Sequence, residues 1–403
     1  MQSNMLYIKS MNYLAQHFWN NDTNCIDGLA LWNALQPHIE KGELVVNEGK
    51  GEREGLKLVT YSKTYQYEHN SVAWDPLVQH CRGIIFDATD DYKIVALPFS
   101  KFFNYGEGGI HYPSAGAEIE QVWTKYDGSL FIIFHWKDKW HGTTRGSLNS
   151  DIGMIGQQIL DEYVHSGLVM HSDYTYLAEL IYKENQIVVN YGDDRKLVLL
   201  GVRHRRAGHV YQPDWIIDRF HGGLTIKPFE VARRWKFANK EEMLAWLNQT
   251  KGTEFEGFVV HFSDGSIFKF KSEDYMRLHR IIAQFTFKRV LEAVQLHQEE
   301  EIRKALPEEL IPEFDRYTDM IEDKVDSIIA YVDKIVHNAP KESRKEFALY
   351  LQQYYKGTDA MKYAFKYLDF EMNADKLGEH ILQSLRRDDF EVAEDKNKDD
   401  IDS

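Results

Sequence analysis

Lys125-Tyr126-Asp127-Gly128-Ser129 is the stretch of the sequence that decides the fold. It stands between strand-like flanks, and the run that follows, Leu130 to Trp136, is rich in β-branched and aromatic residues. Taken alone, Asp127-Gly128 between two strands is typical of a hairpin turn on the surface. The alternative is that Lys125 is a chemically reactive lysine, and segments elsewhere in the chain decide between the two.

Three later segments carry charged residues within strand-like runs. They contain Glu179, then Glu256, then Lys269 and Lys271. Together with Lys-x-Asp-Gly, this series resembles the covalent nucleotidyltransferases, which include DNA ligases, RNA ligases and mRNA capping enzymes. In that superfamily the motif lysine attacks the α-phosphate of a nucleoside triphosphate, so the resemblance implies that Lys125 is the nucleophile.

The chemistry of a lysine nucleophile gives this set a physical reason. A lysine at its ordinary pKa of about 10.4 is protonated and cannot attack phosphorus. Lys269 and Lys271 alternate by two on a predicted strand and should share one face, where they would lower the pKa of Lys125 and neutralise phosphate oxygens. Glu256 begins a strongly apolar strand, where an unpaired carboxylate is costly, so we expect a divalent metal or the nucleotide as its partner.

The segments upstream of Lys125 distinguish the branches of the superfamily. His80-Cys81-Arg82-Gly83-Ile84-Ile85-Phe86 and Lys101-Phe102-Phe103-Asn104 resemble the bacteriophage RNA ligase 1 family. Arg145-Gly146-Ser147 and Tyr275 also match its pattern, although a lysine is usual in that family where Arg145 stands. The resemblance covers about residues 80–280, and its motifs are specific as a series.

The resemblance implies a three-step reaction and a role for each matched residue. Lys125 would form a lysyl-AMP from ATP, AMP would pass to the 5′-phosphate of an RNA, and a 3′-hydroxyl would then displace AMP. Glu256 is expected to position the metal, Mg²⁺ or Mn²⁺, or the nucleotide. Expected nucleotide-binding or phosphate-binding residues are Arg82, Lys101, Arg145, Glu179, Lys269, Lys271 and Tyr275. The expected partner is RNA, with a broken tRNA among the candidates.

The fold class that we predict is α+β. Strand-like runs dominate from about residue 43 to 270, among them Gln186 to Asn190, with helical patches at about 5–20, 151–166 and 239–249. From near Tyr275 to about residue 386 the pattern is helical, and we expect the domain boundary at about 275–285. We therefore expect an adenylyltransferase domain over 1–278, with the ATP-grasp-like antiparallel sheets that the resemblance implies, an all-helical RNA-specificity domain over 279–387, and a disordered acidic tail over 388–403.

Composition limits how the protein can bind nucleic acid and in which compartment we expect it. The 403 residues carry a formal charge of −15, which argues against a general basic surface that coats nucleic acid. Basic clusters such as Arg203 to Arg206 suit an enzyme that binds a few phosphates at one site. Two cysteines, no signal peptide and no apolar run near 20 residues predict a cytoplasmic protein without a membrane span. We expect a monomer.

Two other functions stay open on the sequence. A DNA ligase or capping enzyme would share the nucleotide-binding series, although such enzymes usually continue into a small β-barrel of the OB type. A catalytically silent RNA-binding relative would keep the fold without the reaction. It would have no need for all of Lys125, Glu179, Glu256, Lys269 and Lys271.

Overall fold

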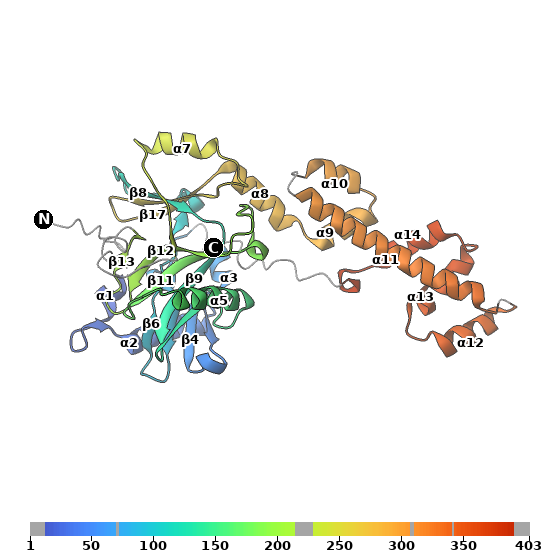
Figure 1. The fold of residues 1–403 in the computed structure, drawn as a ribbon, viewed down its shortest axis with the longest axis horizontal. Helices are drawn as coiled ribbons and strands as arrows, with labels where there is room; N and C mark the ends of the chain where they lie inside the picture. Colours follow the sequence, from blue (N-terminus) through green and yellow to red (C-terminus); the bar gives the residue numbers. More distant parts are fainter. Residues whose placement is uncertain (1–12, 70–71, 214–228, 307–309, 341, 391–403) are drawn as a thin grey trace. The chain divides into compact units, whose positions relative to one another are not determined.

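The computed structural model describes residues 13–69, 72–213, 229–306, 310–340 and 342–390. The chain divides into two compact units between His279 and Arg280. The first unit holds the sheets and the second is helical, so the predicted α+β class is confirmed (Figure 1). Within the described residues, no helix is both long and apolar enough to cross a lipid bilayer.

A four-stranded antiparallel sheet opens the first unit. Its strand order is β3 (Leu44–Glu48), β4 (Leu56–Tyr61), β5 (Arg82–Asp87) and β6 (Lys93–Ala96). The neighbouring helices and a small two-stranded ribbon are α1 (Tyr13–Phe18), β1 (Trp19–Asn20), β2 (Cys25–Ile26), α2 (Gly28–Glu40), α3 (Lys63–Glu68) and α4 (Pro76–His80). The helix expected at 5–20 is shorter than predicted where it is described, since the chain turns extended at Trp19.

A second sheet has the strand order β10-β9-β11-β12-β13, with β14 added parallel to β12. Its strands are β9 (Ser129–Trp136), β10 (Lys139–Thr144), β11 (Tyr174–Ile181), β12 (Lys196–His204), β13 (Val210–Tyr211) and β14 (Glu230–Val231). Helix α5 (Asp151–His165) packs against it through Ile159 and Leu160, and it confirms the helix predicted at 151–166. Nearly every residue of β9 is buried, which fits a central strand.

A third sheet has the order β15-β8-β16-β17-β7. Its strands are β7 (Phe103–Asn104), β8 (Ile119–Lys125), β15 (Arg234–Trp235), β16 (Gly257–Phe262) and β17 (Ile267–Lys271). Helix α7 (Lys240–Asn248) adds Met243 and Leu247 to the core of this sheet, as the prediction at 239–249 required. Because Gly257 pairs with both Lys125 and Lys271, the three strands bring these two lysines to one end of the sheet.

The segment from Lys125 to Ser129 joins two sheets and is not a hairpin. Strand β8 belongs to the third sheet and β9 to the second, and the two are not paired. The surface-turn interpretation of Asp127-Gly128 is therefore wrong. Another expectation also fails, because Gln186 to Asn190 form no strand; the short 3-10 helix Lys183–Asn185 leads instead into a loop.

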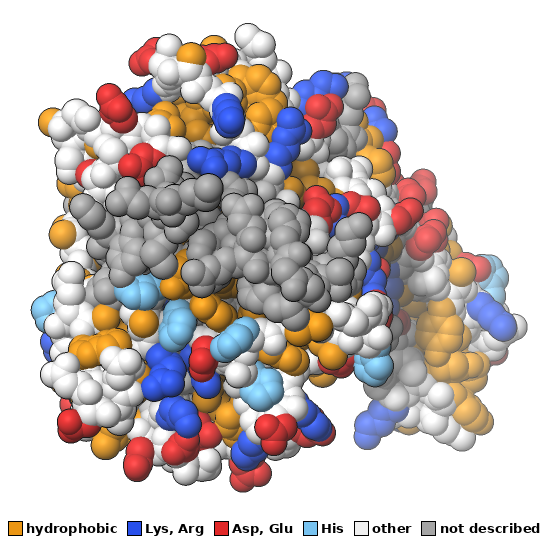
Figure 2. Space-filling view, turned by 60° about the vertical axis from the view of Figure 1, so that its left-hand side comes forward, with side chains coloured by type: hydrophobic (Ala, Val, Ile, Leu, Met, Phe, Trp, Pro, Cys, Tyr) orange, Lys and Arg blue, Asp and Glu red, His pale blue; other side chains and the backbone are white. Residues whose placement is uncertain are grey.

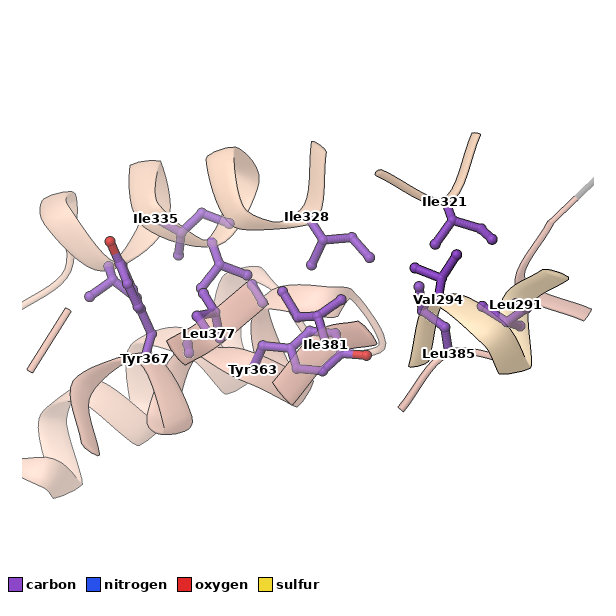
Figure 3. Close-up of a cluster of buried hydrophobic side chains, with 14 of the residues drawn as sticks. Leu291, Val294, Ile321, Ile328, Ile335, Tyr363, Tyr367, Leu377, Ile381 and Leu385 are labelled. Carbon is purple, nitrogen blue, oxygen red and sulfur yellow. The ribbon is translucent and has the colours of Figure 1, made fainter. Parts of the chain in front are cut away.

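The second unit is a helical assembly with an apolar core. Helix α8 (Glu273–Gln284) crosses the boundary between the units, and the following helices are α9 (Phe287–Gln295), α10 (Glu299–Ala305), α11 (Ile311–Asn338), α12 (Arg344–Tyr354), α13 (Asp359–Asp369) and α14 (Ala374–Ser384). Figure 3 shows side chains of α9, α11, α13 and α14 meeting in this core. A short 3-10 turn, Arg387–Asp389, ends the described chain, and residues 391–403 of the expected tail lie outside it.

Candidate active site

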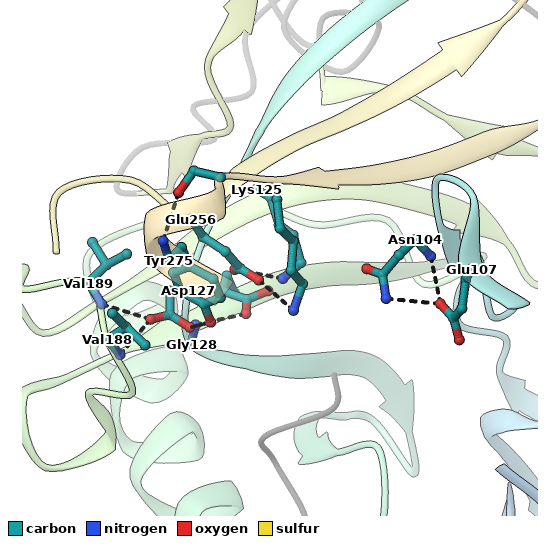
Figure 4. Close-up of polar contacts among 12 residues, drawn as sticks. Asn104, Glu107, Lys125, Asp127, Gly128, Val188, Val189, Glu256 and Tyr275 are labelled. Atoms are coloured by element: carbon teal, nitrogen blue, oxygen red, sulfur yellow. Dashed lines mark hydrogen bonds and ion pairs between the residues drawn. The ribbon is translucent and has the colours of Figure 1, made fainter. Parts of the chain in front are cut away.

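Lys125 ends strand β8 and forms an ion pair with a buried carboxylate. Its Nζ lies 2.7 Å from Glu256 Oε2, and Lys271 Nζ lies 3.1 Å from Glu256 Oε1 (Figure 4). Glu256 is only 1% exposed. Burial raises the pKa of Glu256, but Lys125 and Lys271 outweigh that effect and hold the pKa below its ordinary value. The sequence predicted a metal or the nucleotide as the partner of Glu256, and the structure adds two lysine partners that the sequence did not predict.

The electrostatics of Lys125 differ from the prediction. Burial lowers the pKa of Lys125, but Glu256 and then Glu179 raise it, so the pKa lies above its ordinary value. The expectation that neighbouring cations keep Lys125 neutral is therefore wrong for the nucleotide-free site. The lysine with a pKa well below its usual range is Lys269, because of burial and then the charges of Lys125 and Arg82.

Asp127 organises the backbone behind the nucleophile. Its Oδ2 accepts hydrogen bonds from the backbone N–H groups of Val188 and Val189, both at 2.8 Å. Its Oδ1 accepts one from Tyr275 Oη at 2.8 Å (Figure 4). These bonds explain why the segment 186–190 is a loop: two of its N–H groups bind a side chain and are not available to a strand ladder.

Tyr275 is buried beside Asp127 and is not among the residues that line the cavity. The sequence predicted a nucleotide contact for Tyr275, whereas in the structure its hydroxyl donates a hydrogen bond to Asp127.

Glu179 reaches the same connection from strand β11 of the second sheet. Its Oε1 accepts a hydrogen bond from the N–H of Gly128 at 3.1 Å. Gly128 has no space for a side chain, since a Cβ would lie 2.5 Å from the carbonyl oxygen of Leu180. Burial raises the pKa of Glu179 to about 7, with Lys125 opposing the rise and Glu256 adding to it. Glu179 is therefore a carboxyl group that can change protonation state near neutral pH.

A cavity with a volume of about 780 Å³ lies between residues of the second and third sheets. Lys125, Glu179, Arg82 and Lys269 bring charge to its lining. The other lining residues are mostly apolar: Phe99, Phe102, Trp123, Thr124, Tyr126, Leu130, Leu200, Val210, Gln212, Ala232, Val259, His261 and Ile267. Predominantly apolar walls with a few convergent polar groups are typical of a small-molecule site.

Arg82, Lys101 and Arg145 gather around one aromatic ring. Lys101 Nζ lies 5.5 Å from the ring centroid of Tyr61 and the Arg145 guanidinium carbon lies 5.1 Å from it. Burial raises the pKa of Tyr61, but Arg145, Arg82 and Lys101 lower it below its ordinary value. The sequence analysis did not identify Tyr61. The one feature of the sequence that could have indicated it is a tyrosine, with its polar hydroxyl, at the buried end of strand β4.

The cluster of Arg82, Lys101 and Arg145 gives the first unit a local positive charge. Figure 2 shows that Lys and Arg on the face drawn are interspersed with Asp and Glu. Arg203, the first residue of the basic cluster at Arg203 to Arg206, is 1% exposed and donates to the backbone oxygens of Gly208 and Pro98. Its role in the structure is to hold two loops together.

A metal site made by protein groups alone is absent from the part of the chain that the structure describes. No three His, Cys, Asp or Glu side chains are grouped there closely enough to hold an ion. Magnesium usually binds through one or two carboxylates together with substrate phosphates. Glu256, which faces Lys125, fits such a minimal site, and the described residues are compatible with a metal that arrives with a nucleotide.

Comparisons with known proteins agree on one family. A family model described as RNA ligase matches residues 80–293. An RNA ligase of Rhodothermus phage RM378 is 23% identical over 75% of this chain and 85% of its own length. A protein of Autographa californica nuclear polyhedrosis virus, named as a bifunctional polynucleotide kinase/RNA ligase, is 29% identical over 51% of this chain. The match spans only 31% of the viral protein's length.

Solved structures include similar proteins at low identity. An archaeal ATP-dependent RNA ligase aligns with 84% of this chain and 95% of its own, at 13% identity and a TM-score of 0.42. A Naegleria gruberi RNA ligase mutant with AMP and Mn aligns with 40% of this chain and 52% of its own, at 16% identity and a TM-score of 0.32.

Proposed function

The chain belongs to the RNA ligase family, and from this premise we propose that it is an ATP-dependent ligase that joins RNA 5′-phosphate and 3′-hydroxyl ends. The reaction would pass through lysyl-AMP and RNA-adenylate intermediates. The observation that carries the proposal is the geometry around Lys125, whose Nζ lies at a cavity shared with Lys269 and is paired with the buried Glu256. A surface lysine in a turn has no such surroundings.

In the first step Lys125 Nζ forms a bond to the α-phosphorus of ATP, and the bond from that phosphorus to the pyrophosphate oxygen breaks. Lys125 must first lose a proton, because its paired state raises its pKa. Glu256 Oε2, at 2.7 Å, is the nearest acceptor that the described residues provide. A second carboxyl, Glu179, titrates near neutral pH and contributes to the charge that Lys125 experiences.

The cations around the cavity would stabilise the phosphate groups. Lys269 lines the cavity, and burial followed by the neighbouring cations lowers its pKa. An anionic phosphate would supply the opposite charge that favours its protonated form. Arg82 also lines the cavity, and Lys101 and Arg145 lie with it around Tyr61. Fixed positive charge at the reacting phosphate is the usual way in which proteins accelerate phosphoryl transfer.

A divalent ion, Mg²⁺ or Mn²⁺, would neutralise phosphate charge when it is bound with ATP. Glu256 is the residue that we expect to hold it, after Lys125 has been released from the ion pair. Phosphate oxygens and water would supply its other ligands, as is common for magnesium sites.

We assign selection of the RNA to the second unit. The basis is that none of the described residues of this unit lines the cavity, while its helices α9 to α14 enclose a core of their own. Repair of broken RNA, including tRNA, is the biological role that we propose for the ligase.

The test is covalent labelling. Full-length protein is incubated with ATP labelled at the α-phosphate and with Mg²⁺ or Mn²⁺, and the protein–AMP adduct is measured. We expect an adduct with the wild type, none with Lys125→Ala, and a normal amount with the control Lys139→Ala, which removes an exposed lysine of strand β10. The absence of an adduct in the wild type would contradict the proposal.

A substrate panel then separates the alternatives. The adenylylated protein is given 5′-phosphorylated RNA and DNA, each single stranded and nicked, and joined products are measured. Sealing of nicked DNA but not of RNA would indicate a DNA ligase, and labelling by GTP in place of ATP would indicate a capping enzyme. Binding of RNA without any AMP transfer would indicate a silent relative.

A further inference from the structure

One face of the third sheet forms the floor of the cavity, and its chemistry changes along the strands. Lys125 stands at one end of this face, whereas Lys269 pairs with Val259 and stands nearer the middle. Trp123 and Val259, which are cross-strand partners, follow as an apolar middle. Beyond them lies His261. Along strands β8 and β16 the floor therefore runs from Lys125, through two apolar residues, to one neutral polar residue.

The position of His261 follows from the register. His261 pairs with Gln121 on β8, whereas Lys125 pairs with Gly257, four residues earlier on β16. At about 3.3 Å per residue, the two positions are about 13 Å apart along the strand. The side chains of Val259 and His261 lie on the face of the sheet to which position 257 also belongs, because strand residues alternate. His261 therefore lines the same cavity as Lys125, but at a distance suited to the opposite end of a nucleotide.

His261 has an unused polar atom. The side chain is 7% exposed, and its Nδ1 is buried without a hydrogen-bond partner among the described residues. Burying a polar atom without a partner costs free energy, and such atoms are rare in native structures. Because His261 is one of the residues that line the cavity, a ligand atom bound there would be the partner that this nitrogen lacks.

The imidazole is also held in its neutral form. Burial lowers the pKa of His261 to about 3, and the charge of Arg234 adds to the effect. A neutral imidazole has one N–H group and one lone pair, so it can form one specific hydrogen bond with a base but offers no charge to a phosphate.

We propose that His261 is the residue that recognises the nucleobase, by a hydrogen bond to the edge of the purine that carries the 6-amino group. This inference rests on the proposed function, because it takes Lys125 to mark the phosphate end of a bound ATP. The purine ring would then lie over Trp123 and Val259, and its six-membered ring would be the part farthest from the phosphates. His261 thereby becomes a specificity-determining residue and not a catalytic one.

The experiment compares ATP with purine riboside triphosphate, which lacks only the 6-amino group. Initial rates of protein–nucleotide adduct formation give kcat/KM for each nucleotide in full-length wild type, His261→Leu and His261→Asn. The matched control is His141→Leu, because His141 is also buried, on strand β10, but does not line the cavity.

We expect the wild type to prefer ATP by about tenfold, the worth of one hydrogen bond that is lost without compensation. In His261→Leu the preference should fall to about one, because kcat/KM drops for ATP but not for the analogue. His261→Asn should keep part of the preference and His141→Leu all of it.

The two hypotheses fail in different ways. A wild type that forms no adduct with either nucleotide overturns the proposed function and the inference with it. A wild type that forms an adduct with both nucleotides equally well overturns the inference alone, and this outcome needs no variant to fold. An unchanged preference in His261→Leu or His261→Asn also overturns the inference.

Discussion

The two units of this protein place their charges in opposite ways. Within the described chain, every buried polar or charged side chain lies in the first unit, between Thr60 and Ser272. The core cluster of the second unit contains only hydrophobic residues. Burying ions costs several kcal/mol for each ion unless partners compensate for the lost water. The first unit buries charged side chains despite this cost, which we attribute to the reaction that we propose for it. The described second unit buries none.

The ion pairs show the same contrast. In the first unit the side chains of Lys125 and Glu256 are 10% and 1% exposed. In the second unit the side chains of Arg303 and Asp315 form a two-pronged contact but are 50% and 41% exposed. A buried pair senses every change in nearby charge, whereas water and salt screen an exposed pair. We therefore expect charge substitutions to alter the first unit and apolar substitutions to alter the second.

The largest effect should follow from Lys269→Ala. This change removes a cation from the cavity where we place the α-phosphate, and loss of one such group typically costs about 10²–10³-fold in rate. The rate of protein–AMP formation in single-turnover labelling measures it, with Lys139→Ala as the control. A loss below threefold would mean that Lys269 does not face the phosphate.

The second unit should respond most to a truncation in its core. Ile321 of α11 is completely buried, and Ile321→Ala should lower the free energy of unfolding of this unit by about 2–5 kcal/mol (Figure 3). Hydrogen exchange in peptides from α11 of the full chain measures the change. Tyr331→Ala, at an exposed position of the same helix, is the control.

Adduct formation should stay at the wild-type level in Ile321→Ala, since the residues described in the second unit include none that lines the cavity. Loss of the adduct in this variant would contradict the hypothesis that adenylylation depends on the first unit alone.

A smaller effect should appear in the pH dependence of the first unit. Burial raises the pKa of Glu179 to about 7 from an ordinary value of 4.5, so the folded state binds this proton more tightly than the unfolded chain does. Its contribution to stability is full below about pH 4.5 and is lost as the pH rises through about 7. In Glu179→Gln this pH-dependent contribution, on the order of 1–3 kcal/mol, should vanish.

Denaturant unfolding from pH 4.5 to 8 measures this contribution, with tryptophan fluorescence as the signal. All nine tryptophans precede Arg280, so the fluorescence reports the first unit alone. Glu184→Gln, at an exposed position, is the control. A pH profile that is identical in wild type and Glu179→Gln would contradict the raised pKa of Glu179.

Sequence reasoning succeeded where a pattern depends on neighbours along the chain. The strand alternation of Lys269 and Lys271 predicted a shared face, and the change to helical periodicity near residue 279 predicted the helical second unit. The segment order also predicted that Lys125 and Glu256 belong to one site, although it did not show that they form an ion pair.

Sequence reasoning failed where the answer depends on pairing across the fold. The sign of the Lys125 pKa shift is set by Glu256, 131 positions away, and no local pattern reveals a contact of that kind. Tyr61 and His261 were missed for the same reason, because a tyrosine or histidine within a strand is ordinarily part of the core. The surrounding cations distinguish Tyr61, and the register and the cavity distinguish His261.

The smallest effect is expected for Arg303→Ala, which tests whether the second unit is insensitive to the loss of a charge. The change removes the exposed pair with Asp315, whose attraction is screened by water, so the unfolding of the second unit should not change measurably at 0.15 M salt. Hydrogen exchange in α10 and α11 of the full chain is the measurement, with Ile321→Ala on the same scale. If Arg303→Ala destabilised the unit as much as Ile321→Ala, the second unit would depend on charge as the first does. The difference between the two units would then lie only in how deeply each buries its ions.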